Sequence, residues 1–165
     1  MTPEIEMLER AVVALGELAP NLIFVGGAVV GLLLTDEAAA MPRSTADIDV
    51  LVLSRSRHAY HAVEEQMRSL GFQNDTESDV ICRWRGFGLI VDLMPAYDEI
   101  LGFTNRWYLS AVEKAHPMEL PSGAIIKVID GPRMLATKLV AYEGRGNGDA
   151  FGSHDLEDIV LLVDG

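Results

Sequence analysis

Two aspartates separated by one residue, Asp47 and Asp49, stand at the start of an apolar run that ends at Leu53. A run of this length is typical of a buried strand, and a strand sends alternate side chains to the same face. Both carboxylates are therefore expected to point the same way. Like charges about 4 Å apart repel by about 4 kcal/mol at a near-surface effective dielectric constant. A bound divalent cation would remove this repulsion.

Length and composition predict one domain over residues 1–165 with a genuine core. Of the 165 residues, 49% are hydrophobic, and a domain of about 150 residues buries about 70% of the surface that its unfolded chain exposes. No segment approaches the ~20 uncharged apolar residues of a membrane helix, and the start Met1–Glu4 lacks the basic region of a signal peptide. The single cysteine, Cys82, fits a reducing compartment. We therefore expect a cytoplasmic protein with no membrane partner.

The charge balance argues against binding of nucleic acid over a large surface. The chain has 25 acidic and 13 basic residues, a formal charge of -12, whereas non-specific binding depends on Lys and Arg neutralising phosphates. Any such contact must be local. The basic side chains that could provide it, or could simply be solvated, are Arg43, Arg55, Arg57, His58, Arg83 and Arg85.

Hydrophobic periodicity and turn residues predict an α/β (α+β) fold, a small mixed β-sheet flanked by helices. Helices are predicted over 3–18, 28–34, 57–70, 106–115, 132–142 and 154–163. Strands are predicted over 22–25, 47–53, 79–84, 89–93, 118–120 and 125–128. The third and fourth strands are expected to form a hairpin, and residues 144–152 a flexible surface loop.

A third carboxylate, Asp92, lies in the apolar strand Leu89–Leu93. If this strand runs beside that of Asp47 and Asp49, at about 4.8 Å, three carboxylates converge. Such oxygens suit Mg²⁺, with Mn²⁺ as the alternative, and two ions could clamp both sides of a phosphoryl displacement. The alternative is that Asp47 caps a turn, Asp49 bonds to backbone and Asp92 pairs with a nearby arginine. The three residues together favour the metal.

Three further features could serve a phosphate group. Gly26 and Gly27 place bare N–H groups before a predicted helix, where phosphate is attracted, although such a turn is also common without a ligand. Lys138 lies at the edge of an apolar helix face, from which its ammonium could reach phosphate or simply extend to solvent. Asp155 and Asp158 share a face in the first turn of the last helix, where acidic residues also favour the helix dipole.

Five motifs follow one another between about Leu22 and Val163. They are Gly26-Gly27, Thr45-Ala46-Asp47-Ile48-Asp49, Val91-Asp92-Leu93, Lys138 and Asp155-Leu156-Glu157-Asp158-Ile159. This ordered set resembles the DNA polymerase beta-like nucleotidyltransferase superfamily. Within it, the chain is most similar to the AbiEii-type nucleotidyltransferases, the toxins of type IV toxin-antitoxin systems.

The resemblance implies roles for the acidic residues. Asp47 and Asp49 would hold magnesium and the nucleoside triphosphate. Asp92 would complete the metal site and help to deprotonate the acceptor hydroxyl. Asp155 or Asp158 would correspond to the late acidic residue of the family.

It also implies a nucleotide pocket. Lys138 would contact phosphate, Gly26 and Gly27 would cradle the triphosphate, and Arg43 and Thr45 would line the pocket. Many members of the superfamily have Gly-Ser where this chain has Gly-Gly, so backbone amides would replace the serine hydroxyl.

The implied activity is transfer of a nucleoside monophosphate from a nucleoside triphosphate such as ATP to an acceptor hydroxyl. The resemblance favours RNA, such as the 3′ end of tRNA, as the acceptor, and an antitoxin protein as a partner. The acidic balance and the short chain leave room for a small molecule such as an aminoglycoside, or for a protein side chain. A non-catalytic nucleotide-binding module is the rival interpretation.

Overall fold

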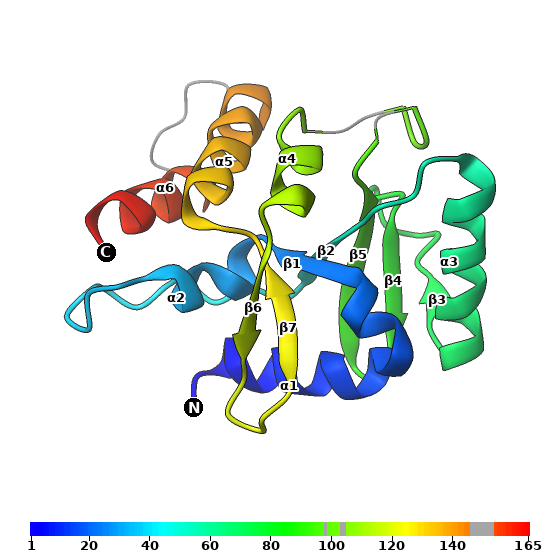
Figure 1. The fold of residues 1–165 in the computed structure, drawn as a ribbon, viewed down its shortest axis with the longest axis horizontal. Helices are drawn as coiled ribbons and strands as arrows, with labels where there is room; N and C mark the ends of the chain where they lie inside the picture. Colours follow the sequence, from blue (N-terminus) through cyan, green and yellow to red (C-terminus); the bar gives the residue numbers. More distant parts are fainter. Residues whose placement is uncertain (98, 103–104, 146–153) are drawn as a thin grey trace.

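A single seven-stranded mixed sheet organises the chain (Figure 1). The computed structural model describes residues 1–97, 99–102, 105–145 and 154–165. The strand order is β3-β4-β5-β2-β1-β7-β6, with β1–β7 and β2–β5 parallel and the other pairs antiparallel. The predicted fold class is confirmed. The strands are β1 (Leu22–Val25), β2 (Ile48–Val52), β3 (Gln73–Asn74), β4 (Arg83–Gly86), β5 (Leu89–Pro95), β6 (His116–Glu119) and β7 (Ile125–Val128).

Helices flank this sheet, and their ends carry the expected signals. Thr2 accepts a hydrogen bond from the Ile5 N–H at the start of the first helix, and Ser56 accepts one from Ala59 at the start of α3. Gly71 ends α3 in the left-handed conformation. The helices are α1 (Pro3–Leu15), α2 (Val30–Leu33), α3 (Arg57–Leu70), α4 (Tyr108–Glu113), α5 (Gly131–Arg145) and α6 (His154–Asp164), with 3₁₀ turns η1 (Gly16–Asn21) and η2 (Gly27–Val29).

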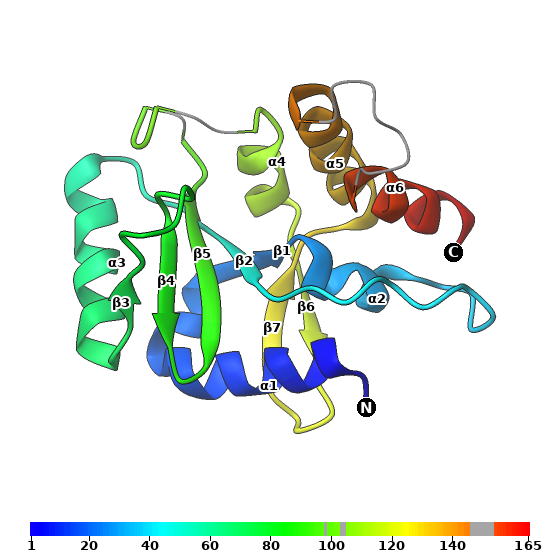
Figure 2. The ribbon, with the colours of Figure 1, turned by 180° about the vertical axis from the view of Figure 1, so that it is seen from behind.

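The two ends of the sheet carry different helices. Figures 1 and 2 show α3 beside β3 and β4 at one end of the molecule, and α5 and α6 packed together at the other. Among the helices described, none combines the length and apolar character needed to cross a membrane.

The central strands form the core and give the sheet a rigid middle. Phe24 on β1, Val50 on β2 and Leu93 on β5 have no exposed surface, and full burial of such a side chain contributes about 1.5–3 kcal/mol. These strands are covered on both faces, which is why they appear in the sequence as continuous apolar runs. Polar side chains carried by β2 and β5 are therefore held on a well-packed support.

Several predicted boundaries are wrong where local hydrogen bonds override the apolar pattern. The strand predicted over 79–84 begins only at Arg83, because residues before it turn: Val80 N–H donates to the Ser78 hydroxyl and Arg83 N–H to the Val80 carbonyl. The hairpin itself is confirmed. The helix predicted over 28–34 is shorter and divided between η2 and α2. Gly144 belongs to α5, and the rest of the predicted 144–152 loop, from 146, lies outside the described residues.

Candidate active site

Strands β2 and β5 bring the three predicted carboxylates together. In their parallel pairing, Asp49 stands opposite Asp92, and Asp47 precedes β2 by one residue, two positions before Asp49. One oxygen of each side chain lies within 4.8 Å of the others. Adjacent ligands of an octahedral Mg²⁺ ion lie about 3.0 Å apart and opposite ligands about 4.2 Å, since each Mg–O distance is about 2.1 Å. The donor set therefore suits a hard cation, and the three carboxylates would draw closer together to bind a single ion. We call these three residues the carboxylate triad.

Gly26 borders the triad, and a side chain at this position would collide with Asp49. Its φ is +73°, and a Cβ atom at this position would lie 2.0 Å from Oδ2 of Asp49. Glycine is thus needed both for the backbone conformation and for the close approach of the turn to the carboxylate. Because the following η2 has three residues and α2 only four, the helix dipole behind this turn is weaker than the sequence suggested.

Thr45 and Arg43 lie beside Gly27 of the glycine turn. The Thr45 hydroxyl donates a hydrogen bond to Oδ1 of Asp47 at 2.7 Å, which orients that carboxylate. A Cβ atom on Gly27 would lie 3.5 Å from the Thr45 hydroxyl and 3.6 Å from Nη2 of Arg43. Arg43 Nε is buried and has no hydrogen-bond partner among the described residues. The turn is therefore lined by a hydroxyl and a guanidinium as well as by carboxylates.

A second cluster joins α5 and α6. Nζ of Lys138 lies 2.8 Å from Oδ2 of Asp158 and 3.5 Å from Oδ1 of Asp155, and Nη2 of Arg43 lies 3.7 Å from the same Asp158 oxygen. The Asp158 side chain is 1% exposed. Both of these ion-pair contacts are made by Oδ2, and neither oxygen has a well-aligned hydrogen bond among the described residues. Asp158 thus brings the side chains of Lys138 and Arg43 together. Arg43 connects this cluster to the turn at Gly27.

Arg83 is the site residue that the sequence analysis did not single out. It stands opposite Asp92 in the β4–β5 pair, with Nε 2.9 Å from Oδ1 and Nη2 2.9 Å from Oδ2 of Asp92. Nη2 also lies 2.9 Å from Oδ2 of Asp47. The hydrogen bonds that Arg83 donates to Asp92, and then the charge of Asp92, raise the pKa of Arg83 above its usual value, against the effect of burial. The ion pair of Asp92 expected in the alternative interpretation is therefore present.

The sequence contained one signal for Arg83. Arg83 and Arg85 are two residues apart, so in an extended strand they point to the same face. The other strand of the predicted hairpin carries Asp92. Only the register, which the structure supplies, separates them: Arg85 pairs with Asp75. The other basic side chains considered, Arg55, Arg57 and His58, are exposed around the start of α3.

Two buried groups, Tyr60 and Cys82, lie near the strand that carries Asp92, and Tyr60 supports it. The Tyr60 hydroxyl on α3 donates a 2.8 Å hydrogen bond to the Leu93 carbonyl, and burial raises the pKa of Tyr60, which keeps it a donor. Cys82 is buried. Burial, then the charges of Asp92 and Asp49, raise the pKa of its thiol to about 12. Since the nucleophile is the thiolate, Cys82 is not suited to covalent chemistry.

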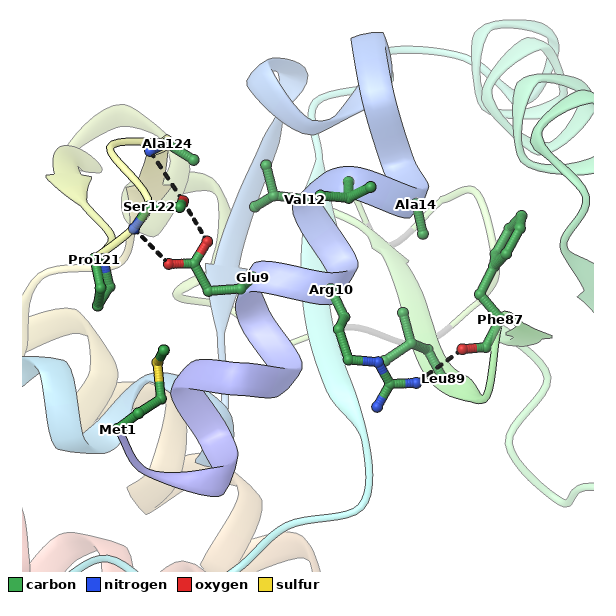
Figure 3. A pocket seen from close by; sticks show the side chains of 11 residues that line it. Met1, Glu9, Arg10, Val12, Ala14, Phe87, Leu89, Pro121, Ser122 and Ala124 are labelled. Atoms are coloured by element: carbon green, nitrogen blue, oxygen red, sulfur yellow. Dashed lines mark hydrogen bonds between the residues drawn. The ribbon is translucent and has the colours of Figure 1, made fainter.

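A large surface pocket lies elsewhere. It has a volume of about 810 Å³ and is lined by residues of α1, with Met1 and Pro121 on one side of this helix and Phe87 and Leu89 on the other (Figure 3). None of its lining residues is a predicted site residue. The polar groups that could act on a nucleotide gather at the triad and the glycine turn instead.

Comparison with known proteins supports this fold assignment. No protein-family model and no curated protein sequence matches the chain. An antigenic nucleotidyltransferase-like protein from Paracoccidioides brasiliensis matches in structure with a TM-score of 0.61 and 15% identity, over 98% of this chain and 75% of that one. The antibiotic-resistance factor ANT(2'')-Ia matches with a TM-score of 0.58 and 15% identity, over 98% and 83%. The structure of ANT(2'')-Ia in complex with adenylyl-2''-tobramycin matches with a TM-score of 0.57 and 15% identity, over 99% of this chain and 89% of that one.

These similarities define the class of fold. The chain has the mixed-sheet fold of these nucleotidyltransferases. The carboxylate triad lies on the two parallel central strands of that fold, next to a glycine turn.

Proposed function

We propose that the chain, as one domain over residues 1–165, is a metal-dependent nucleotidyltransferase. The observation that carries the proposal is the meeting of Asp47, Asp49 and Asp92 beside the Gly26 turn. Like charges at this distance repel, and the single guanidinium of Arg83 offsets only part of the charge of three carboxylates.

The triad would hold the metal, as Mg²⁺ or Mn²⁺. Its donors are all carboxylate oxygens, the ligands that hard cations take. The lack of a Cβ at Gly26 keeps the turn clear of Oδ2 of Asp49. When bound, such ions neutralise charge on a triphosphate and help to ionise an attacking hydroxyl.

The phosphate groups would lie against the glycine turn. The guanidinium of Arg43 stands beside this turn, with Nη2 3.6 Å from the position of a Cβ on Gly27, and its buried Nε has no hydrogen-bond partner among the described residues. Lys138, held beside Arg43 by Asp158, would add a second positive charge. Asp155 and Asp158 would then hold the side chains of Lys138 and Arg43 in place. They would not contact the reacting atoms, so their role would be to position these two basic residues.

The reaction is an in-line displacement at the α-phosphorus. The acceptor oxygen forms a bond to that phosphorus, and the bond from the α-phosphorus to the α–β bridging oxygen breaks. Pyrophosphate leaves with the electron pair of the broken bond. The proton of the acceptor hydroxyl passes to Asp92, whose two oxygens are held in place by Arg83.

Two acceptor classes are supported by different observations. The resemblance to AbiEii-type toxins supports RNA, such as the 3′ end of tRNA, and with it an antitoxin partner. The formal charge of -12 supports a cationic small molecule, because an acidic protein attracts such an acceptor and repels a polyanion. Among proteins of this fold, ANT(2'')-Ia has been solved with adenylyl-2''-tobramycin.

The test is release of pyrophosphate from each α-labelled nucleoside triphosphate, with tRNA and with an aminoglycoside in separate reactions. Transfer of label to either acceptor in the presence of Mg²⁺ or Mn²⁺ supports the proposal and selects the acceptor. Binding of nucleotide without release of pyrophosphate in any reaction, cell extract included, supports the non-catalytic module and contradicts it.

A further inference from the structure

The guanidinium of Arg83 already donates to three of the six carboxylate oxygens of the triad. Both oxygens of Asp92 and Oδ2 of Asp47 accept hydrogen bonds from it, each at 2.9 Å. The remaining oxygen of Asp47 accepts from the Thr45 hydroxyl at 2.7 Å. All four oxygens of these two carboxylates therefore have a donor. A cation that binds the triad must share these oxygens or take them from Arg83.

The position of Arg83 is set by the sheet. It stands directly across from Asp92 in the antiparallel β4–β5 pair, as Asp92 stands across from Asp49 in the parallel β2–β5 pair. Its side chain is 19% exposed and that of Asp92 7%. Charge-assisted hydrogen bonds of this bidentate kind are among the strongest in proteins. The strand register and the low exposure of both side chains thus hold Arg83 at the site.

Its charge also changes what the triad can bind. Three carboxylates carry a charge of -3, and the guanidinium reduces it to -2. A divalent cation at the triad meets both the competition for oxygens and the repulsion of a positive charge a few ångströms away.

We propose that Arg83 is a positioning residue that competes with the divalent cation for Asp47 and Asp92 and so lowers the metal affinity of the triad. This inference rests on the proposed function. A purely structural Arg83 has the opposite consequence, because loss of a residue that only holds the carboxylates in place would weaken metal binding or leave it unchanged.

The chain offers a matched control in Arg85. It lies two residues further along β4 and pairs with Asp75, which is not a member of the triad. Arg83→Met and Arg85→Met therefore remove the same charge from the same strand, but only the first removes hydrogen bonds to the triad.

The experiment titrates Mn²⁺ into the full chain without nucleotide and follows binding by calorimetry and by loss of the free-ion electron paramagnetic resonance signal. Arg83→Met is expected to bind Mn²⁺ at least about tenfold more tightly than the unchanged chain, whereas Arg85→Met should bind like the unchanged chain. Adding Asp49→Asn to Arg83→Met should remove the gain. Arg83→Gln, which keeps a polar side chain, should show the same direction if the methionine variant does not fold.

Two failures can be told apart. Equal or weaker Mn²⁺ binding by the folded Arg83 variants, while Asp49→Asn weakens binding in the unchanged chain, overturns the inference and leaves the proposed metal site in place. No binding of Mn²⁺ by any chain overturns both.

Discussion

Asp49 on β2 and Asp92 on β5 stand opposite each other in a parallel strand pair, so that two separate segments of the chain contribute to one acidic site. Parallel pairing requires a long connection, and here α3 and the β3–β4 segment lie between the two strands in sequence. The site therefore exists only in the folded chain.

The contact between Gly26 and Asp49 predicts a large effect of a single methyl group. Gly26→Ala would put Cβ 2.0 Å from Oδ2 of Asp49 at a φ of +73°. We expect a loss of about 1–3 kcal/mol in the free energy of unfolding, and loss of Mn²⁺ binding because Asp49 must move. Chemical denaturation and calorimetry measure the two effects.

Gly102→Ala is the control for the backbone conformation alone. Gly102 has a φ of +76°, and a Cβ there would meet no atom of the described residues within 4 Å. It should cost about 1–2 kcal/mol and leave Mn²⁺ binding intact. If Gly26→Ala binds Mn²⁺ as well as Gly102→Ala does, the proposed fit between the turn and Asp49 is wrong.

Asp158 should matter for stability more than its place in a terminal helix suggests. Among the residues that the structure describes, Asp158→Asn leaves the buried ammonium of Lys138 with the longer contact to Asp155 as its one ion pair. Removing one partner of a buried ion pair costs about 3–5 kcal/mol, to be measured by urea denaturation. Glu157→Gln, on the same helix with a 55% exposed side chain, should change stability by less than about 0.5 kcal/mol. Equal effects of the two substitutions would show that the α5–α6 cluster does not hold the helices together.

The thiol of Cys82 predicts a pH dependence of stability. Its pKa is about 12 in the folded chain, raised from 9.0, so above pH 9 the unfolded chain releases this proton while the folded chain retains it. The free energy of unfolding should then fall as pH rises, by up to about 1.4 kcal/mol per pH unit from this group. Cys82→Ala should fall less steeply between pH 9 and 10, as measured by denaturation at each pH. Parallel curves for the two chains would contradict the raised pKa.

The central strands could be predicted because burial on both faces leaves a continuous apolar run. The run ending at Leu53 and the run Leu89–Leu93 both show it. The side-chain alternation of a strand then places Asp47 and Asp49 on one face, as expected from sequence alone.

The partners of these aspartates could not be predicted in the same way. Register between strands depends on which residues pair across the sheet, and no local pattern shows that Arg83 rather than Arg85 stands opposite Asp92. The contact of Arg43 with Asp158 joins residues more than 100 positions apart, and it arises from the packing of α6 onto the rest of the fold. The boundaries of β4 and η2 were set by turn hydrogen bonds at Val80 and Gly26.

The central claim is that the carboxylate triad performs nucleotidyl transfer. Its most direct test is pyrophosphate release by the unchanged chain and by Asp49→Asn, with Asp79→Asn, an exposed residue of the turn before β4, as the control. We predict Mg²⁺-dependent release by the unchanged chain and by Asp79→Asn, and a loss of at least about a thousandfold in Asp49→Asn with the melting temperature nearly unchanged. Turnover by Asp49→Asn at the rate of the unchanged chain would contradict the account.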